Sequence, residues 1–355
     1  MGKLAVYKYI SLMILVVQLI VTAYTFLGLF GGDVSPIGNT ARAMVVYILP
    51  ILIVLNFILL IYWLIRKRWF ISIIPFVTIA CCIPYITTLV QFRSLDTKAD
   101  SQPGLKIATY NVARFNRETS GFLAQDILAE MKRQKVDIFC IQEYMETGGE
   151  RRNSALYKEY FPYLAMAGRD VVIFSKYPFK ESKPLLFEGS NQAGMWADVD
   201  VNGKIIRIFN VHLETTGINR TIYKAGKLAA QGYEFDENRV LKAIYGNYTL
   251  GMMARTGQAN ILAQEIRNTT VPTIVCGDFN DVPYSYVYKT MKGGLVDGFK
   301  ECGSGGWMGT YRGRKNVRID YIFHSESMEG LSYYKVDLTY SDHYPVFMKL
   351  ALQQQ

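Results

Sequence analysis

The chain has 355 residues, of which 50% are hydrophobic, and a formal net charge of +9 at pH 7. Residues 1–98 hold eight Lys/Arg and two Asp/Glu, whereas residues 99–355 hold 31 basic and 28 acidic residues, which leaves the second part little of the excess positive charge that non-specific nucleic-acid binding needs. Five cysteines without a CxxC pair indicate neither a disulfide framework nor a zinc site.

Three apolar stretches without charge lie in the first quarter of the chain: Tyr9–Gly32, Ala43–Ile65 and Trp69–Phe92. A helix of about 20 residues crosses the ~30 Å hydrocarbon core of a bilayer. Each stretch is therefore predicted to span a membrane, with residues 9–92 in contact with the lipid bilayer and residues 1–93 forming an anchor. The few polar side chains inside the spans predict hydrogen bonds between helices rather than a transport path; they are Gln18, Asn56 and Thr78.

Basic residues at the ends of the spans predict the orientation of the chain. One side carries five of them and the other side carries three: Lys3, Lys8, Arg66, Lys67 and Arg68 against Arg42, Arg93 and Lys98. The positive-inside rule places the larger group in the cytoplasm. Three crossings then put the C-terminal part on the non-cytoplasmic face, which is the periplasmic face of the inner membrane in a bacterium. A cleaved signal peptide is the alternative for the first stretch, although no clear small-residue cleavage site ends it.

A polar, turn-forming linker over residues 94–104 separates the anchor from a domain over residues 105–355. Short β-rich runs alternate there with helical patterns at 121–134 and 252–268, which predicts an α/β or α+β domain built on packed sheets. The runs cover residues 105–112, 136–143, 170–176, 205–213, 273–280, 318–324 and 344–350.

Polar side chains recur where these predicted strands end, as expected of a site at one edge of a sheet. They include Asn111, Glu143, His212, Asp278, Asn280, Asp320, Asp342 and His343. By contrast, His324 lies in an apolar strand and is predicted to be a core residue.

The motifs that contain these residues resemble the endonuclease/exonuclease/phosphatase superfamily. In chain order they are IQE (141–143), NVHL (210–213), GDFND (277–281), RIDYIF (318–323) and SDHYP (341–345). Residues 283–299 further resemble membrane-anchored bacterial members. The resemblance implies an α+β fold with a four-layer α/β/β/α sandwich, here preceded by three transmembrane α-helices. It also implies divalent-metal-dependent hydrolysis of a phosphoester.

The resemblance assigns the metal, Mg²⁺ or Mn²⁺, to oxygen ligands. Glu143 would be the metal carboxylate, with Asn111 as a direct or indirect ligand and Asp342 as a further candidate. The alternative for Asn111 is a side chain that satisfies the backbone at a strand end.

The catalytic roles follow from the same resemblance. Asp278 would orient or deprotonate the attacking water, and Asn280 would donate to the phosphate. His343 would pair with Asp320, and His212 would hydrogen-bond a phosphoryl oxygen. The alternative for the GDFN segment is a simple turn.

Two departures from the family pattern stand out. Ala113 occupies a position where some nucleases of the family have a further acidic ligand, which argues against a second metal. Arg169, Asp170 and Val171 replace the small residues usual before Ser175.

Residues 215–250 form a long excursion rich in Tyr and Lys/Arg, and they are our candidate for the element that selects the substrate. A plain solvated helix and loop is the alternative. For the whole chain we expect a membrane-anchored phosphoester hydrolase acting on a lipid, a small molecule or nucleic acid, and we infer no protein partner. A catalytically silent, membrane-tethered binding or scaffolding domain is the alternative function.

Overall fold

The computed structural model describes residues 3–117, 121–146, 153–168, 170–231, 237–312 and 316–352. Contacts between residues divide the chain into two units. The first consists of Met1–Thr87 and Val282–Lys289, and the second of Thr88–Asp281 and Thr290–Gln355.

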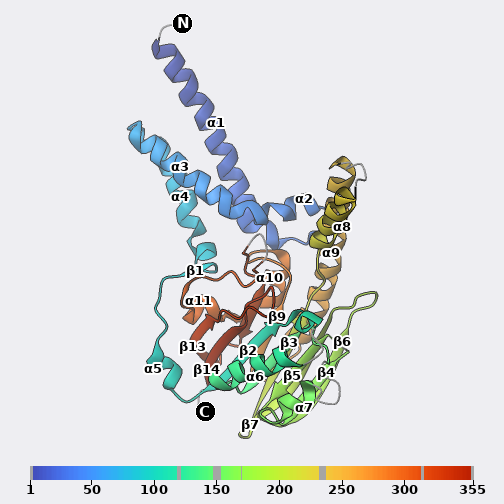
Figure 1. Cartoon of the computed structure of the whole chain (residues 1–355). Coiled ribbons are helices and arrows are strands. Elements are labelled where there is room, and N and C mark those ends of the chain that lie inside the picture. Colours follow the sequence, from blue (N-terminus) through green and yellow to red (C-terminus); the bar gives the residue numbers. More distant parts are fainter. Residues whose placement is uncertain are drawn as a thin grey trace. The chain divides into compact units, whose positions relative to one another are not determined.

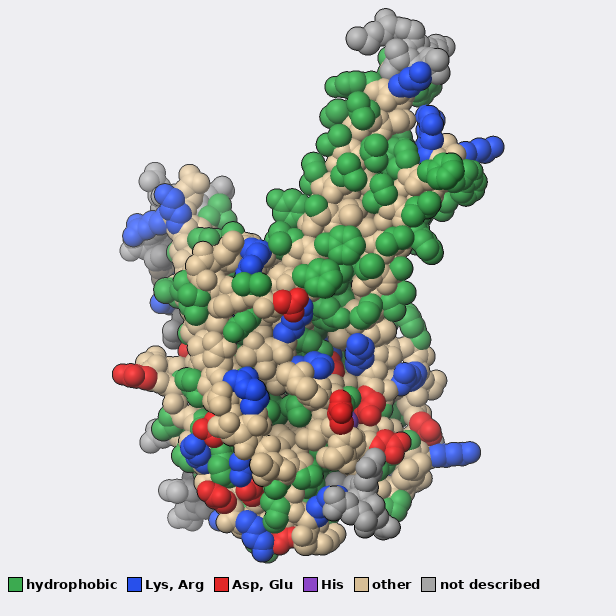
Figure 2. Space-filling model, turned by 180° about the vertical axis from the view of Figure 1, so that it is seen from behind, with side chains coloured by type: hydrophobic (Ala, Val, Ile, Leu, Met, Phe, Trp, Pro, Cys, Tyr) green, Lys and Arg blue, Asp and Glu red, His purple; other side chains and the backbone are tan. Residues whose placement is uncertain are grey.

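The first unit is helical. Three of its helical segments are long and apolar enough to span a membrane, as predicted; they are Val6–Asp33, Thr40–Ile65 and Trp69–Ile86. Figure 2 shows apolar side chains covering their surface, and Phe70, for example, is 90% exposed. Such outward-facing apolar groups suit lipid rather than water. The elements are α1 (Lys3–Phe30), η1 (Gly31–Asp33), α2 (Thr40–Ala43), η2 (Met44–Ile48), α3 (Leu49–Ile65) and α4 (Trp69–Ile86).

The third apolar helix is shorter than the sequence suggested. It was expected to continue to Phe92, but α4 ends at Ile86. The apolar pattern continues past that point because Val90–Gln91 forms strand β1, which pairs with β11 (Gly306–Trp307) in a two-stranded sheet. Backbone groups that hydrogen-bond to another strand cannot at the same time continue a helix.

A polar network joins the three long helices inside the first unit. The Nε2 atom of Gln18 donates to Oδ1 of Asn56 at 3.0 Å, and Nδ2 of Asn56 donates to Oγ1 of Thr25 at 2.9 Å. The hydroxyls of Thr22 and Thr78 lie 3.4 Å apart. The predicted hydrogen bonding between helices is confirmed, and it fixes which faces of α1, α3 and α4 meet.

The segment Val282–Lys289, which directly follows the GDFND motif, packs within the first unit. The Nζ atom of Lys289 donates to Oδ1 of Asp33 at 2.7 Å. The ring of Tyr284 packs edge-on against that of Tyr85, with centroids 5.3 Å apart. A stretch remote in sequence from the apolar helices is thus part of the same compact unit.

The second unit contains two six-stranded sheets (Figure 1). One has the order β13-β14-β2-β3-β5-β4, and the other has the order β10-β12-β9-β8-β7-β6. The strands of the first sheet are β2 (Leu105–Asn111), β3 (Ile138–Gln142), β4 (Tyr163–Ala167), β5 (Val171–Ser175), β13 (Met328–Lys335) and β14 (Val346–Leu352). Those of the second are β6 (Phe179–Leu186), β7 (Ala193–Val201), β8 (Lys204–His212), β9 (Thr273–Asp278), β10 (Val296–Asp297) and β12 (Asp320–His324).

The two sheets pack face to face and carry helices on their outer faces. Alternate strand residues, such as Ile107 and Ile208, fill the core between the sheets. The opposite face of the first sheet packs on α6, which contributes Ile127. On the second sheet, Leu262 of α9 packs against Gly194 of β7, where an added Cβ would lie only 3.0 Å away. The predicted α+β, four-layer sandwich is confirmed.

The other helices that the structure describes lie in the second unit, except for the first half of α10, which belongs to the first unit. They are α5 (Thr97–Ser101), η3 (Ala113–Arg117), α6 (Phe122–Arg133), α7 (Asn153–Lys158), α8 (Ile218–Ala230), α9 (Glu237–Arg267), α10 (Tyr286–Lys292) and α11 (Gly298–Cys302). The excursion over residues 215–250 folds as α8 and the first part of α9, while residues 232–236 lie outside the described part of the chain. Tyr223 and Leu241 on these helices are exposed. The substrate-selecting role of this element stays a prediction.

Candidate active site

Polar side chains from separate segments meet at one edge of the two sheets. The parallel pairs β2–β3 and β8–β9 end there, which aligns Asn111 with Gln142 and His212 with Asp278. Strand β12 runs antiparallel to β9 and begins at the same edge, so Asp320 lies opposite Asp278. The expectation that these strand ends gather one group of polar residues is confirmed.

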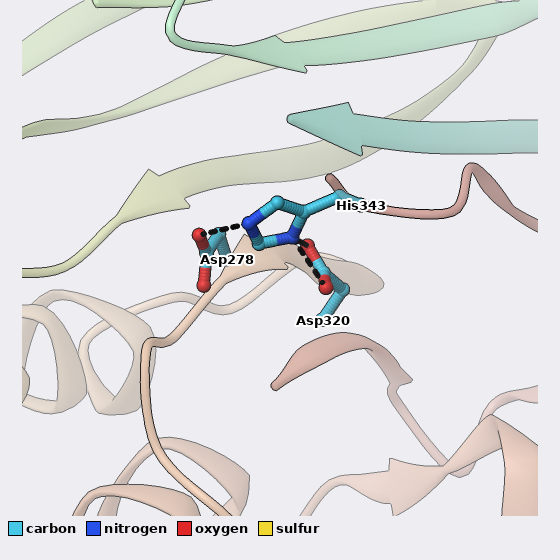
Figure 3. Close-up of side chains that lie close together, drawn as sticks. All are labelled: Asp278, Asp320 and His343. Atoms are coloured by element: carbon cyan, nitrogen blue, oxygen red, sulfur yellow. Dashed lines mark hydrogen bonds and ion pairs between the residues drawn. The ribbon is translucent and has the colours of Figure 1, made fainter. Parts of the chain in front are cut away.

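His343 lies between two carboxylates at this edge (Figure 3). Its Nδ1 atom is 3.0 Å from Oδ2 of Asp320, and its Nε2 atom is 3.6 Å from Oδ2 of Asp278. All three side chains are nearly inaccessible to solvent. The backbone N–H of Asp320 donates to Oγ1 of Thr310, which holds the start of β12 in place. The Asp320 carboxylate therefore fixes the ring orientation of His343 and directs Nε2 toward Asp278.

A second Asp–His pair approaches the same oxygen of Asp278. The Nδ1 atom of His212 lies 2.8 Å from Oδ1 of Asp170, and its Nε2 atom lies 3.9 Å from Oδ2 of Asp278. Asp170 also accepts the backbone N–H of Ala193 at 3.0 Å. Sequence reasoning noted Asp170 only as a departure from the family pattern. The signal that could have found it is a carboxylate directly before the apolar strand 171–175, at the edge where the other polar residues gather.

The arrangement shifts the pKa values of His212, His343 and Asp278. Burial alone would lower the pKa of His212, but the carboxylates around it, Asp170 first, raise it to about 9. Burial would likewise lower the pKa of His343, but Asp320 and Asp278 raise it to about 10. Desolvation raises the pKa of Asp278 to about 6, although the neighbouring His343 lowers it. Both imidazoles are therefore hydrogen-bond donors at neutral pH, and Asp278 titrates close to neutrality.

Glu143 and Asn111 lie beside this group. The Nδ2 atom of Asn111 is 3.4 Å from Oε1 of Glu143 and 3.1 Å from Oδ2 of Asp278, while its Oδ1 atom accepts the backbone N–H of Ala113 at 3.0 Å. Two carboxylates thus converge on one amide, which stands where a cation would be held. The carboxylate oxygens of Glu143 and Asp278 suit Mg²⁺ or Mn²⁺, so these residues fit such a metal; Asn111 would add its Oδ1 once the amide turns so that this oxygen faces the cluster. The Glu143 side chain is 32% exposed, which leaves this side open to solvent.

Asp278, Asp320 and His343 also have the ligand types of a metal site, because their ligand atoms lie within 4.8 Å of one another. However, Nδ1 of His343 is already hydrogen-bonded to Asp320. A hydrogen-bonded Asp–His pair suits proton transfer and charge stabilisation better than it suits a hard cation that prefers oxygen. Glu143 and Asn111 are therefore the better metal candidates.

Asn280 is part of the same cluster. Its backbone N–H donates to Oδ1 of Asp278 at 2.8 Å, and its Nδ2 atom donates to the backbone oxygen of Leu213 at 2.9 Å. The left-handed φ of +51° at Asn280 makes this short turn possible, and Asn tolerates that conformation better than most residues. The side-chain Nδ2 atom, which was predicted to donate to the phosphate, also lies 3.3 Å from Oδ2 of Asp278 and helps to hold that carboxylate in position.

Asp342 is the predicted ligand that the structure does not bring to Glu143. Its side chain is exposed, and Oδ1 lies 3.5 Å from Oγ of Ser341. Within the described residues its carboxylate contacts neither Glu143 nor Asn111. The hydroxyl of Ser341 donates a hydrogen bond to the backbone oxygen of Asn111 at 2.7 Å. This bond joins residues 341–343 to the cluster.

A left-handed turn follows β2 and presents Arg114 to the site. All five residues of Ala113–Arg117 have φ between 46° and 57°, a conformation that costs about 1–2 kcal/mol for each L-residue. The backbone N–H of Arg114 donates to the backbone oxygen of Glu143 at 3.0 Å, and Nδ2 of Asn116 donates to the backbone oxygen of Tyr340 at 2.7 Å. The surrounding loops therefore hold the turn in place. As a result, Nε of Arg114 lies 3.6 Å from Oε2 of Glu143. Sequence reasoning did not single out Arg114.

Two further features support the catalytic loops. Gly277 has a φ of +132°, and a Cβ there would lie 1.9 Å from the backbone oxygen of Val211, so only glycine lets β9 approach β8 this closely. Arg318 forms a fully buried ion pair with Asp297, with 2.6 Å between Nη2 and Oδ1. This pair anchors the segment that leads into Asp320.

His324 is a core residue, as predicted. It is fully buried on β12, and its Nε2 atom lies 2.8 Å from Oε2 of Glu301. Its Nδ1 atom lies 3.0 Å from the backbone oxygen of Ser325. Since Asp320 is at the opposite end of the same strand, His324 is not part of the site.

Comparison with known proteins supports the sequence motifs. A model of the Endonuclease/Exonuclease/phosphatase family matches residues 108–343, which contain every residue of the site described above. A model of a domain of unknown function matches residues 11–89. No curated protein matches the sequence.

Solved structures resemble about 70% of this chain at low identity. The endonuclease/exonuclease/phosphatase from Beutenbergia cavernae is 17% identical over 71% of this chain and 72% of its own length, with a TM-score of 0.49. The one from Bacteroides vulgatus is 18% identical over 71% of this chain and 100% of its own, with a TM-score of 0.48. The mannosyl-6-phosphatase of Bacteroides thetaiotaomicron is 18% identical over 70% of this chain and 99% of its own length, with a TM-score of 0.46.

Proposed function

This chain belongs to the Endonuclease/Exonuclease/phosphatase family, and we propose that it is a membrane-anchored phosphoester hydrolase that depends on a divalent metal ion. Residues 1–93 would serve as the anchor, residues 94–104 as the linker and residues 105–355 as the catalytic domain. The observation that carries the proposal is the convergence of two Asp–His pairs on Asp278, beside the Glu143 carboxylate and the Asn111 amide.

Asp278 is the group that takes a proton from the attacking water. A carboxylate with a pKa of about 6 is mostly ionised at pH 7 and still basic enough to accept that proton as the water oxygen bonds to phosphorus. The amides of Asn280 hold the carboxylate in place while this occurs. The leaving oxygen departs on the opposite side of the phosphorus atom, as in-line displacement requires.

The two imidazoles stabilise the charge that builds on the phosphoryl oxygens. The Nε2 atoms of His212 and His343 both face Asp278, so their N–H groups can donate to a phosphate placed next to that carboxylate. Asp170 and Asp320 hold these rings in orientation and keep them protonated. A charged donor in a buried site is worth more than the same donor in water.

Glu143 and Asn111 would hold a Mg²⁺ or Mn²⁺ ion on the open side of the site. When bound, the ion neutralises phosphoryl charge and stabilises the leaving oxygen. Arg114 next to Glu143 adds a fixed positive charge near the position where Ala113 replaces an acidic residue.

Membrane anchoring favours a lipid or a small phosphoester as the substrate over nucleic acid. The catalytic part of the sequence is nearly balanced in charge, whereas non-specific DNA binding requires a basic track along the backbone phosphates. The distribution of Lys and Arg around the spans supports an inner-membrane protein whose catalytic domain lies on the periplasmic face.

The test is a substrate panel with the purified full chain in detergent. Bis-p-nitrophenyl phosphate, sphingomyelin and plasmid DNA are assayed with Mg²⁺, with Mn²⁺ and with EDTA. We expect hydrolysis of at least one phosphoester that stops with EDTA and returns when metal is restored. Hydrolysis that EDTA leaves unchanged would contradict the metal requirement. A complete lack of turnover across the panel and across a wider set of phosphoesters would favour the silent scaffolding domain.

A further inference from the structure

A cavity lined by basic side chains lies at the end of the first sheet that is away from the candidate active site. It is a cavity of about 460 Å³ formed by the last turn of α6, the ends of β2, β5 and β14, and residues 101–104. Its charged lining consists of Lys106, Arg133, Lys135, Lys176, Lys349 and Asp137. Five cationic side chains and one anionic side chain thus face one hollow of a size that ligand sites commonly have.

The strands themselves separate this cavity from the active site. Strand β2 begins at Leu105 and ends at Asn111, so Lys106 and Asn111 are about 17 Å apart at ~3.3 Å per residue. The same opposition holds on β5, where Asp170 precedes the strand and Lys176 follows it. A ligand in the cavity therefore does not reach the Asp278 cluster.

Two of the lysines are held side by side by the sheet. Lys106 and Lys349 are direct cross-strand partners of the antiparallel pair β2–β14. Lys106 is only 5% exposed, and its Nζ atom lies 5.3 Å from the ring centroid of Tyr334. Like charges placed directly opposite in a sheet are destabilising, and burying a charge adds to the cost. An anion in the cavity would remove this repulsion.

Two acidic side chains contact basic residues of the cavity lining. Nζ of Lys176 lies 3.1 Å from Oδ1 of Asp137, and Arg133 makes two hydrogen bonds with Glu130, at 2.7 and 2.8 Å. Oδ2 of Asp137 also accepts the backbone N–H of Lys106 at 3.0 Å. The lining itself contains one carboxylate, that of Asp137, against five basic side chains.

We propose that this cavity binds a small ligand with at least two phosphate groups, held by Lys106, Lys349 and Lys135. Clustered lysine and arginine side chains recognise phosphate oxygens by charge-assisted hydrogen bonds. The cavity binds its ligand without hydrolysing it, because its single carboxylate, Asp137, is engaged by Lys176 and by a backbone N–H. The proposal does not depend on the proposed function, since no catalytic residue takes part.

Inorganic pyrophosphate is the probe, titrated calorimetrically into the full chain in phosphatidylcholine nanodiscs with EDTA present. The protein carries His343→Ala, which removes one phosphate donor of the active site. We expect saturable binding at or below about 1 mM that weakens as salt is added. The Lys135→Gln/Lys349→Gln double variant should weaken binding by at least about tenfold, a loss of ~1.4 kcal/mol.

The matched control is Lys180→Gln/Lys183→Gln, which removes two exposed lysines from β6 of the other sheet. It should leave the affinity for pyrophosphate unchanged. A second series in nanodiscs that contain phosphatidic acid distinguishes the source of the phosphate. Loss of pyrophosphate affinity there identifies a lipid headgroup as the ligand, and unchanged affinity identifies a soluble one. No saturable binding, or equal binding by both double variants, would overturn the proposal.

Discussion

The Nε2 atom of His343 lies 3.6 Å from Oδ2 of Asp278, while the Nδ1 atom of the same ring is hydrogen-bonded to Asp320. The first distance is too long for a strong hydrogen bond, so the Nε2–H group can donate to a third group placed next to Asp278. His212 repeats this relationship: its Nε2 atom lies 3.9 Å from the same oxygen, and its Nδ1 atom is hydrogen-bonded to Asp170. A phosphate that contacts Asp278 would therefore meet two positively charged donors.

Asp170 is expected to act through His212. Changing Asp170→Asn should lower kcat/KM by about 10–100-fold, as loss of a carboxylate behind a functional histidine commonly does. The His212→Gln variant and the Asp170→Asn/His212→Gln double variant should then have similar rates. Both substitutions impair the same hydrogen-bond donor, the Nε2–H group of His212. Rates on bis-p-nitrophenyl phosphate check this. Multiplicative losses in the double variant would show that Asp170 acts independently of His212.

The raised pKa of His212 predicts a dependence of stability on pH in the metal-free protein. A histidine whose pKa is about 9 in the folded state and 6.5 in the unfolded state contributes stability that is fully present below pH 6.5 and is lost as pH rises through 9. The contribution is at most about 3 kcal/mol. Unfolding temperatures in EDTA between pH 6 and pH 10 measure this loss.

The Asp170→Asn variant is the control for that pH series. Without the carboxylate, burial dominates and the pKa of His212 should fall, so the variant should lose less stability between pH 6.5 and pH 9. Because the chain has only three histidines, ¹⁵N-histidine spectra can report the protonation of each ring directly. A His212 ring that is neutral at pH 7.5 in the unchanged protein would be inconsistent with the geometry described.

Glu143 is expected to control metal affinity. The Glu143→Gln substitution should raise the Mg²⁺ or Mn²⁺ concentration for half-maximal activity at least about tenfold, since it removes the charged ligand. Calorimetric titration of the metal in the absence of substrate should show the same loss. Glu326→Gln, at an exposed position, is the matched control and should behave as the unchanged protein. Equal metal affinity in both variants would remove Glu143 from the proposed set.

The predicted orientation can be tested with reporter fusions. Alkaline phosphatase fused after Gln355 should be active, and a cytoplasmic fluorescent protein at the same position should be dark. A fusion after Arg68, which follows two spans, should show the opposite pattern. Fluorescence without phosphatase activity at Gln355 would place the catalytic domain in the cytoplasm.

The strand-end motifs could be predicted from the sequence because each is local. An apolar run followed by a polar residue marks a strand end, and parallel neighbours bring their ends to one edge, so Glu143 and Asp278 could be assigned to one site. Asp170 was not predicted as a site residue because it precedes its strand instead of following it. Only the antiparallel direction of β5 relative to β3 brings it to the same edge.

Features that depend on pairing between distant segments could not be predicted. The Lys106–Lys349 pair joins strands that are far apart in sequence, and no local pattern gives that register. The end of α4 at Ile86 has the same cause, because β1 pairs with a strand more than 200 residues later. The left-handed turn that presents Arg114 contains no glycine that would have marked it.

The central claim is that Asp278 activates water for phosphoester hydrolysis, and one comparison tests it most directly. Initial rates of bis-p-nitrophenyl phosphate hydrolysis at saturating Mg²⁺ or Mn²⁺ are measured for Asp278→Asn and for Asp200→Asn, the same change at a half-buried position near the end of β7. Loss of the general base should reduce kcat at least about 100-fold in Asp278→Asn, whereas Asp200→Asn, which loses only contacts to Lys180 and Gly203, should keep the kcat of the unchanged protein, provided that both variants are folded. A folded Asp278→Asn protein with the rate of the unchanged enzyme would contradict the account.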